Sequence, residues 1–100
     1  MAWIRTDRAE RYGRQLCQHF AEKVEANWSD TSGTADFGDG AHCRLYAAAD
    51  HLQLEASAPE DDGLARVEAI VGGHLERFAR REGLTVHWER QDDKGRLGGD

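Results

Sequence analysis

Two cysteines and one histidine are the residues of this sequence that could hold a metal ion. Cys17, Cys43 and His74 would together offer two thiolates and an imidazole, which resembles an open zinc site completed by water. The sequence has no close-spaced ligand pair of the C-x-x-C type, and His19 would project from a different side of a helix than Cys17. The alternative is that both cysteines are buried and unpaired, because a free thiol packs as a small apolar group.

His74 could instead bind an anion. It lies within an apolar stripe, directly after Gly72 and Gly73 and shortly before Arg77 and Arg81. Together these features would offer a small anionic ligand an imidazole, an accessible backbone and positive charge. Each feature also has a structural alternative: a core histidine satisfied by a carbonyl, a close helix contact that requires glycine, and a charged helix end. We expect His74, Arg77 and Arg81 to mark the ligand site if one exists; no catalytic constellation is recognisable, and enzymatic activity is not expected.

Two helices and a set of short strands must position these residues. Helical periodicity predicts a first helix over about 7–23, capped by Asp7, and a second helix that follows Pro59 and is closed by Gly83. Alternation of apolar and polar residues predicts short strands over 2–6, 24–28, 34–37, 42–47, 52–58 and 84–89. The order is therefore β-α-β-β-β-β-α-β. Because each strand has one apolar face, both helices should pack on the same face of a mostly antiparallel sheet, in a two-layer α+β fold.

The other face of this sheet is predicted to be polar. Its side chains are expected to include histidines, a tyrosine and charged residues: His42, Arg44, Tyr46, Gln53, Glu55, Ser57, Thr85, His87 and Glu89. A solvated surface is the simplest interpretation. The alternative is a docking surface, either for another protein or for a second copy in a homodimer.

Composition limits the classes of function. The chain has 100 residues, which fits one domain over residues 1–90 and a polar, glycine-rich tail over 91–100 that we expect to be flexible. The net charge of -6 argues against binding to nucleic acid or to an anionic membrane, which require basic surfaces. No signal peptide and no run of about 20 apolar residues is visible. Two cysteines are too few for a disulfide framework, so we expect reduced thiols and a cytoplasmic location.

Several blocks of the sequence resemble one bacterial family. Residues 15–23, 40–45, 71–82 and 84–88 are similar to the first helix, a middle strand, the second helix and the last strand of the domain of unknown function 2218. The similarity covers residues 3–90, and the second-helix block is its most specific part. The resemblance implies a short protein without an established activity, and it carries over no catalytic residues.

The same family domain also occurs together with siderophore-interacting, flavin-dependent ferric reductases. The resemblance therefore implies a noncatalytic binding or interaction module that is auxiliary to iron or siderophore metabolism. Its partner would be a small anionic ligand or another protein. The alternative function is a metal-binding protein that uses Cys17, Cys43 and His74. Neither the residues nor the resemblance identifies a cofactor.

Overall fold

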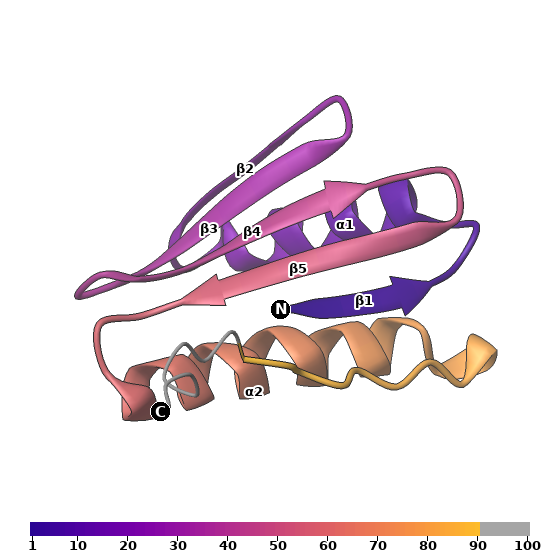
Figure 1. The fold of residues 1–100 in the computed structure, drawn as a ribbon. Helices are drawn as coiled ribbons and strands as arrows, with labels where there is room; N and C mark the ends of the chain where they lie inside the picture. The colour runs from indigo at the N-terminus through magenta and orange to yellow at the C-terminus, as the bar shows by residue number, and fades with distance from the viewer. Residues whose placement is uncertain (91–100) are drawn as a thin grey trace.

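The computed structural model describes residues 1–90, which form an antiparallel sheet and two helices (Figure 1). The elements follow one another as β1 (Ala2–Arg5), α1 (Ala9–Phe20), β2 (Glu25–Ser29), β3 (Ser32–Gly38), β4 (Ala41–Ala47), β5 (His51–Ser57), α2 (Asp61–Phe78) and a 3-10 helix, η1 (Arg80–Glu82). The strand order is β1-β5-β4-β3-β2, and all neighbours are antiparallel. The predicted α+β fold is confirmed. The predicted flexible tail, residues 91–100, lies outside the described residues.

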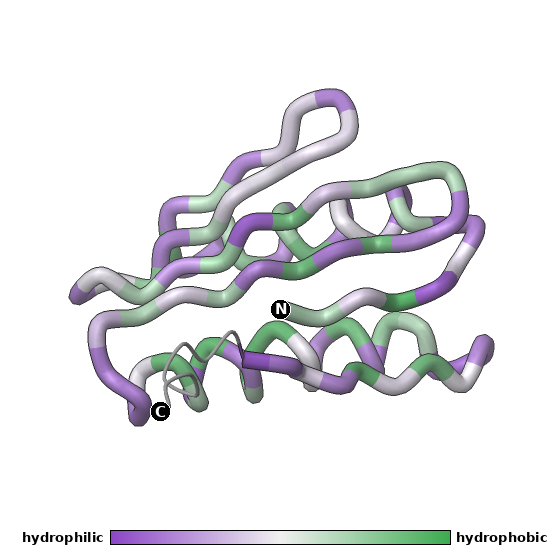
Figure 2. Tube along the Cα trace, in the orientation of Figure 1, coloured by the Kyte–Doolittle hydropathy of each residue, from purple (hydrophilic) through white to green (hydrophobic). Residues whose placement is uncertain are grey.

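A single apolar core lies between the sheet and both helices. The strands contribute alternate residues, which Figure 2 shows as changes between purple and green along the chain. Leu45 on β4 and Leu54 on β5 are fully buried, as are Leu16 on α1 and Val71 and Leu75 on α2. Burial of one such side chain stabilises the fold by about 1.5–3 kcal/mol. The predicted packing of both helices on one face is therefore confirmed.

Both helices end earlier than the sequence pattern predicts. The first spans Ala9–Phe20 instead of 7–23, and its N-cap residue is Arg8, with no side-chain cap from Asp7. The backbone N–H of Arg8 donates to the hydroxyl of Thr6 at 3.1 Å. The second ends at Phe78, where Ala79 leaves helical geometry with φ -101 and ψ 27. Gly83 has the predicted left-handed conformation, with φ 65, but it closes η1 instead of α2.

The last predicted strand is an extended segment that pairs only locally. One antiparallel bridge joins Trp88 to Ala2, and the N–H of Glu89 donates to the carbonyl oxygen of Met1 at 2.8 Å. The N–H of Val86 donates instead to Oε2 of Glu76 at 2.9 Å. The ladder does not continue past this bridge, because within residues 1–90 no backbone hydrogen bond joins Trp3 to His87, the next pair in register. The segment runs along α2 beside β1 (Figure 1).

The two adjacent glycines of α2 have different surroundings. A methyl group at Gly72 would lie 3.0 Å from Nε1 of Trp88 and 3.5 Å from the side chain of Val86. The close helix contact that the sequence suggested is therefore present at Gly72. A methyl group at Gly73 would meet nothing within 4 Å, so no contact requires glycine there.

Alanine substitutions at these two glycines are expected to have opposite effects. Gly73→Ala should raise the free energy of unfolding by about 0.5–1 kcal/mol, because alanine favours the helix and restricts the unfolded chain. Gly72→Ala should lower it, because the indole of Trp88 must move. Urea denaturation of both variants measures the difference. A Gly72→Ala variant as stable as Gly73→Ala would contradict the contact with Trp88.

Candidate functional site

His74 lies where α2 packs against α1. Its Nδ1 donates to the carbonyl oxygen of Ile70 at 2.7 Å, so one ring nitrogen is satisfied by the backbone. Its ring centroid lies 4.6 Å from that of His19 and 5.5 Å from that of Phe20. Phe78 packs with its edge against both histidine rings. This geometry agrees with the structural alternative for His74, a histidine hydrogen-bonded to a carbonyl within an apolar stripe.

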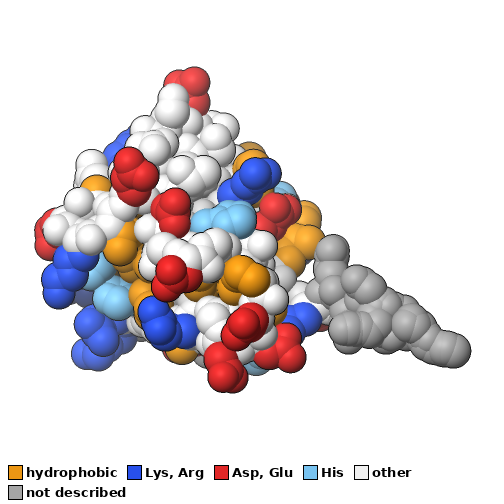
Figure 3. Space-filling model, turned by 90° about the vertical axis from the view of Figure 1, so that its left-hand side faces the viewer, with side chains coloured by type: hydrophobic (Ala, Val, Ile, Leu, Met, Phe, Trp, Pro, Cys, Tyr) orange, Lys and Arg blue, Asp and Glu red, His pale blue; other side chains and the backbone are white. Residues whose placement is uncertain are grey.

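The two arginines that were expected to accompany His74 lie on separate elements. Arg77 is in the last turn of α2, whereas Arg81 is in η1. Their i,i+4 helical spacing is therefore interrupted, because the helix ends between them. Both side chains are exposed, and neither forms an ion pair with any of residues 1–90. Figure 3 shows that basic side chains gather beside histidine along one edge of the face drawn, although the chain is acidic overall.

Cys17 and Cys43 are buried and unpaired, as predicted. The Sγ atom of Cys17 faces Gly33 of β3, and Cys43 lies on β4 opposite Ala35 of β3. Burial raises the pKa of the Cys17 thiol to about 11 and that of the Cys43 thiol to about 12. Metal ligation requires thiolates, so such thiols are poor ligands.

The geometry around these thiols offers no support for a metal centre built with His74. Within residues 1–90, no group of three or more histidine, cysteine or acidic side chains is placed to hold a metal ion. The imidazole of His74 packs against His19 and the phenylalanines instead.

An exposed aromatic row crosses the outer face of the sheet, opposite the helices. Trp3 on β1 is 62% exposed, and its indole stacks on the ring of His51 with centroids 3.7 Å apart and planes inclined by 11°. The strand register places Trp3 opposite Gln53 of β5, and Gln53 opposite Tyr46 of β4, which is 37% exposed. Alternation predicted the outward direction of Gln53 and Tyr46. The same alternation puts Trp3, between the inward Ala2 and Ile4, on the outer face, although Trp3 was not among the residues predicted there.

Charged side chains surround this row. Arg5 lies opposite His51 across the β1–β5 ladder, and Arg44 lies opposite Glu55 across the β4–β5 ladder. Neither arginine forms an ion pair within the described part of the chain. Nδ1 of His51 lies 2.9 Å from Oδ1 of Asp50, and this hydrogen bond holds the pKa of Asp50 below its usual value. The outer face thus combines a flat aromatic surface with two arginines that are free to meet an anion.

Comparisons with known proteins agree with this fold but add no chemistry. A family model described as "Uncharacterized protein conserved in bacteria (DUF2218)" matches residues 1–89. A solved structure, the NMR structure of PA4090 from Pseudomonas aeruginosa, is similar with a TM-score of 0.74 and 36% sequence identity; the match covers 88% of this chain and 91% of that one. A search of curated proteins finds no match. Neither helix of residues 1–90 combines the length and apolar character that crossing a membrane requires.

Proposed function

Since this chain belongs to the DUF2218 family of uncharacterized proteins conserved in bacteria, we propose that it is a noncatalytic binding module with its binding surface on the outer face of the sheet. The observation that carries this proposal is Trp3, which is 62% exposed and yet held in a face-to-face stack on His51. An exposed tryptophan contributes large contact area on binding, and such residues are enriched at binding hot spots. Both helices of residues 1–90 lie on the opposite face of the sheet, so within this part of the chain the ring is accessible.

The ligand that fits this surface best is a small anion with a planar ring. The Trp3–His51 stack offers a flat apolar surface, and Arg5 and Arg44 offer positive charge on the same face. Aromatic carboxylates with catechol hydroxyls have this chemistry and also chelate ferric iron. The proposed role, auxiliary to iron or siderophore metabolism, rests on this chemical match and on the resemblance of the chain to a family whose domain also occurs with siderophore-interacting ferric reductases.

Trp3→Ala is expected to weaken binding of such a ligand at least tenfold, which corresponds to about 1.4 kcal/mol. The probe is 2,3-dihydroxybenzoate, titrated into the isotope-labelled protein while amide chemical shifts are followed by NMR. Shifts are expected at Trp3, His51, Gln53 and Tyr46, and Arg44→Gln should weaken binding by a smaller factor. The variant Arg77→Gln/Arg81→Gln is the matched control, because it removes two positive charges from another surface.

The helix surface around His74 is the second candidate for binding the anion. What favours it is the pair of arginines, Arg77 and Arg81, that have no ion-pair partner within residues 1–90. If the control variant abolishes binding and Trp3→Ala does not, the ligand site is the helix surface and the outer-face proposal is wrong. If the probe causes no shifts and sedimentation shows a dimer that Trp3→Ala dissociates, the outer face binds a second copy of the chain instead.

A further inference from the structure

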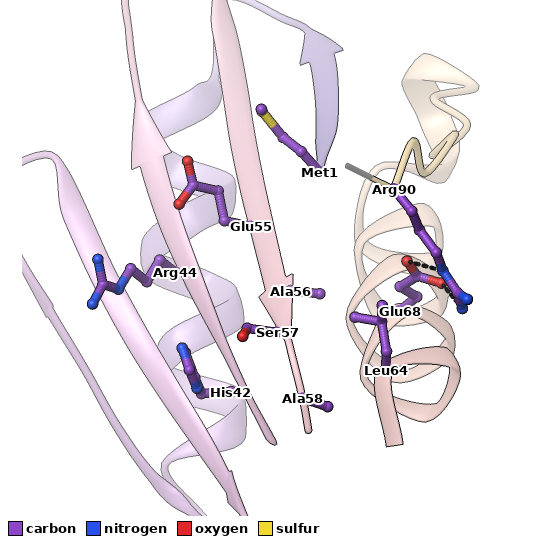
Figure 4. A pocket seen from close by; sticks show the side chains of 10 residues that line it. All are labelled: Met1, His42, Arg44, Glu55, Ala56, Ser57, Ala58, Leu64, Glu68 and Arg90. Carbon is purple, nitrogen blue, oxygen red and sulfur yellow. Dashed lines mark hydrogen bonds and ion pairs between the residues drawn. The ribbon is translucent and has the colours of Figure 1, made fainter. Parts of the chain in front are cut away.

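β2 forms one end of the sheet, and no strand of residues 1–90 pairs with its outer edge. Its five residues pair with β3 in unbroken register, without the proline, lysine or bulge that commonly protects an exposed edge. The described chain finishes elsewhere: the guanidinium of Arg90 binds the carboxylate of Glu68 on α2 (Figure 4), and α2 lies away from β2 (Figure 1).

The register shows which backbone groups face this open edge. The carbonyl oxygen of Thr31 accepts from the N–H of Ala47 at 2.8 Å, so the odd-numbered residues of β3 bond to β4 and the even-numbered ones bond to β2. The even-numbered residues of β3 lie opposite the odd-numbered residues of β2. Ala26 and Trp28 therefore present their N–H and C=O groups at the open edge, where no backbone group of residues 1–90 pairs with them.

A groove of about 300 Å³ lies between this edge and α1. Its lining combines small, aromatic and polar side chains of the two elements: Cys17, Gln18 and Ala21 of α1, and Ala26, Asn27 and Trp28 of β2. Arg14 also lines it and donates to Oε2 of Glu10 at 2.8 Å, so its charge is already paired. The inward side chain of a segment added to β2 would enter this groove.

The outer side of the same edge is negatively charged. Glu25 of β2 lies directly opposite Asp36 of β3, and like charges in such a pair destabilise a ladder. Neither carboxylate forms an ion pair within residues 1–90. The carboxylates of Glu22 and Asp30 flank the two ends of β2, against one ammonium group, that of Lys23. A cation beside Glu25, on the side away from β3, would offset this repulsion.

We propose that the open edge of β2 binds an extended segment of another protein that carries a lysine or arginine opposite Glu25. An unpaired edge recognises an extended backbone, and alternate side chains supply the specificity. In antiparallel register the residues opposite Ala26 and Trp28 exchange backbone hydrogen bonds with them and point toward the groove beside α1. A second copy fits less well, because it brings the same excess of carboxylates. This interface is independent of Trp3, which lies on β1 at the other end of the sheet.

The test uses the full-length, isotope-labelled protein and the blocked peptide acetyl-Lys-Thr-Ala-Thr-Val-Lys-amide, whose valine would lie opposite Ala26 and whose last lysine would lie opposite Glu25. The peptide is expected to shift the amide signals of residues 25–29 and to slow hydrogen exchange of the Ala26 and Trp28 N–H groups. Methylation of the valine nitrogen removes a backbone donor and should weaken binding at least tenfold. Replacement of both lysines by glutamate should weaken it as strongly.

Two variants of the protein test the selection of the cation. Glu25→Gln should weaken binding of the lysine peptide about threefold, as expected for an exposed ion pair, and should leave unchanged the affinity for a peptide that ends in glutamine. Glu60→Gln is the matched control, because it removes an exposed carboxylate at the start of α2 and should bind like the parent. Equal affinity of Glu25→Gln and the parent for the lysine peptide would contradict the pairing with Glu25.

Each other occupant of the edge gives a distinct result. If the Ala26 and Trp28 N–H groups are already protected in the dilute, peptide-free monomer, the chain itself covers the edge and the proposal is wrong. Protection that rises with protein concentration would show that a second copy covers it, which also overturns the proposal. Equal affinity for the methylated and unmethylated peptides would show that the backbone is not recognised. Should Glu25→Gln fail to fold, the comparison of the peptides still decides.

Discussion

Gly33→Ala is expected to lower the free energy of unfolding by about 3 kcal/mol, since overpacking a filled site costs about 1–3 kcal/mol and occasionally more. Gly33 is buried on β3, where an added methyl group would lie 2.6 Å from the carbonyl oxygen of Asn27. It would also lie 2.7 Å from Sγ of Cys17 and 2.7 Å from Cε3 of Trp28. The Asn27 carbonyl belongs to the backbone of β2, so it cannot move without disturbing the ladder.

Chemical denaturation measures this loss, with Gly73→Ala as the control for the same substitution at an open position. The double variant Gly33→Ala/Cys17→Ala separates the contacts, because it removes the sulfur and leaves the carbonyl in place. We expect it to recover only part of the stability relative to Cys17→Ala alone. A Gly33→Ala protein within 0.5 kcal/mol of the parent, a difference no larger than that of ordinary surface substitutions, would contradict the close packing of α1, β2 and β3.

Alkaline pH is expected to destabilise the protein through its two buried thiols. In the unfolded chain a thiol ionises near pH 9, whereas burial raises the pKa of Cys17 to about 11 and of Cys43 to about 12. Above pH 9 the unfolded state therefore binds fewer protons than the folded state, and stability falls as pH rises. Each thiol contributes about 1.4 kcal/mol per pH unit in this window, so the combined loss at pH 10 is on the order of 3 kcal/mol.

Urea denaturation at pH 8, 9 and 10 measures this dependence. The control is Cys17→Ala/Cys43→Ala, whose absolute stability is lower but whose pH dependence should be much flatter over the same range. Burial also raises the pKa of Tyr12, so a small slope in the same direction should remain in the control. Identical slopes for the parent and the double variant would show that the thiols are not protected by burial.

The sequence predicted those features of the fold that depend on local periodicity. Alternation along β4 placed Cys43 and Leu45 inward and His42, Arg44 and Tyr46 outward, and the structure agrees. Helical spacing likewise predicted the buried stripe of Val67, Val71 and Leu75, because residues at such spacing share one side of a helix.

Features that depend on pairing between strands far apart in the sequence could not be predicted from local periodicity. The Trp3–His51 stack requires β1 to lie beside β5, the open edge of β2 requires this strand to be the last of the sheet, and no local pattern states which strands are neighbours. The end of α2 was misplaced for a similar reason. Glu82 accepts a hydrogen bond from the hydroxyl of Thr6 and forms an ion pair with Arg8. These contacts hold the chain after Phe78 out of the helical path that the uninterrupted apolar periodicity predicted.

The pairing of Met1 with Glu89 has a consequence for how the domain can be combined with other chains. The amino group of Met1 donates to the carbonyl oxygen of Glu89 at 2.7 Å, and the N–H of Glu89 donates back to Met1 at 2.8 Å. Met1 and Glu89 therefore lie side by side at the surface. A unit of this kind can be inserted into a surface loop of a host protein without separating the two sides of that loop. It can also be circularly permuted, with a short linker from 89 to 1 and new ends at the exposed turn around Asp30.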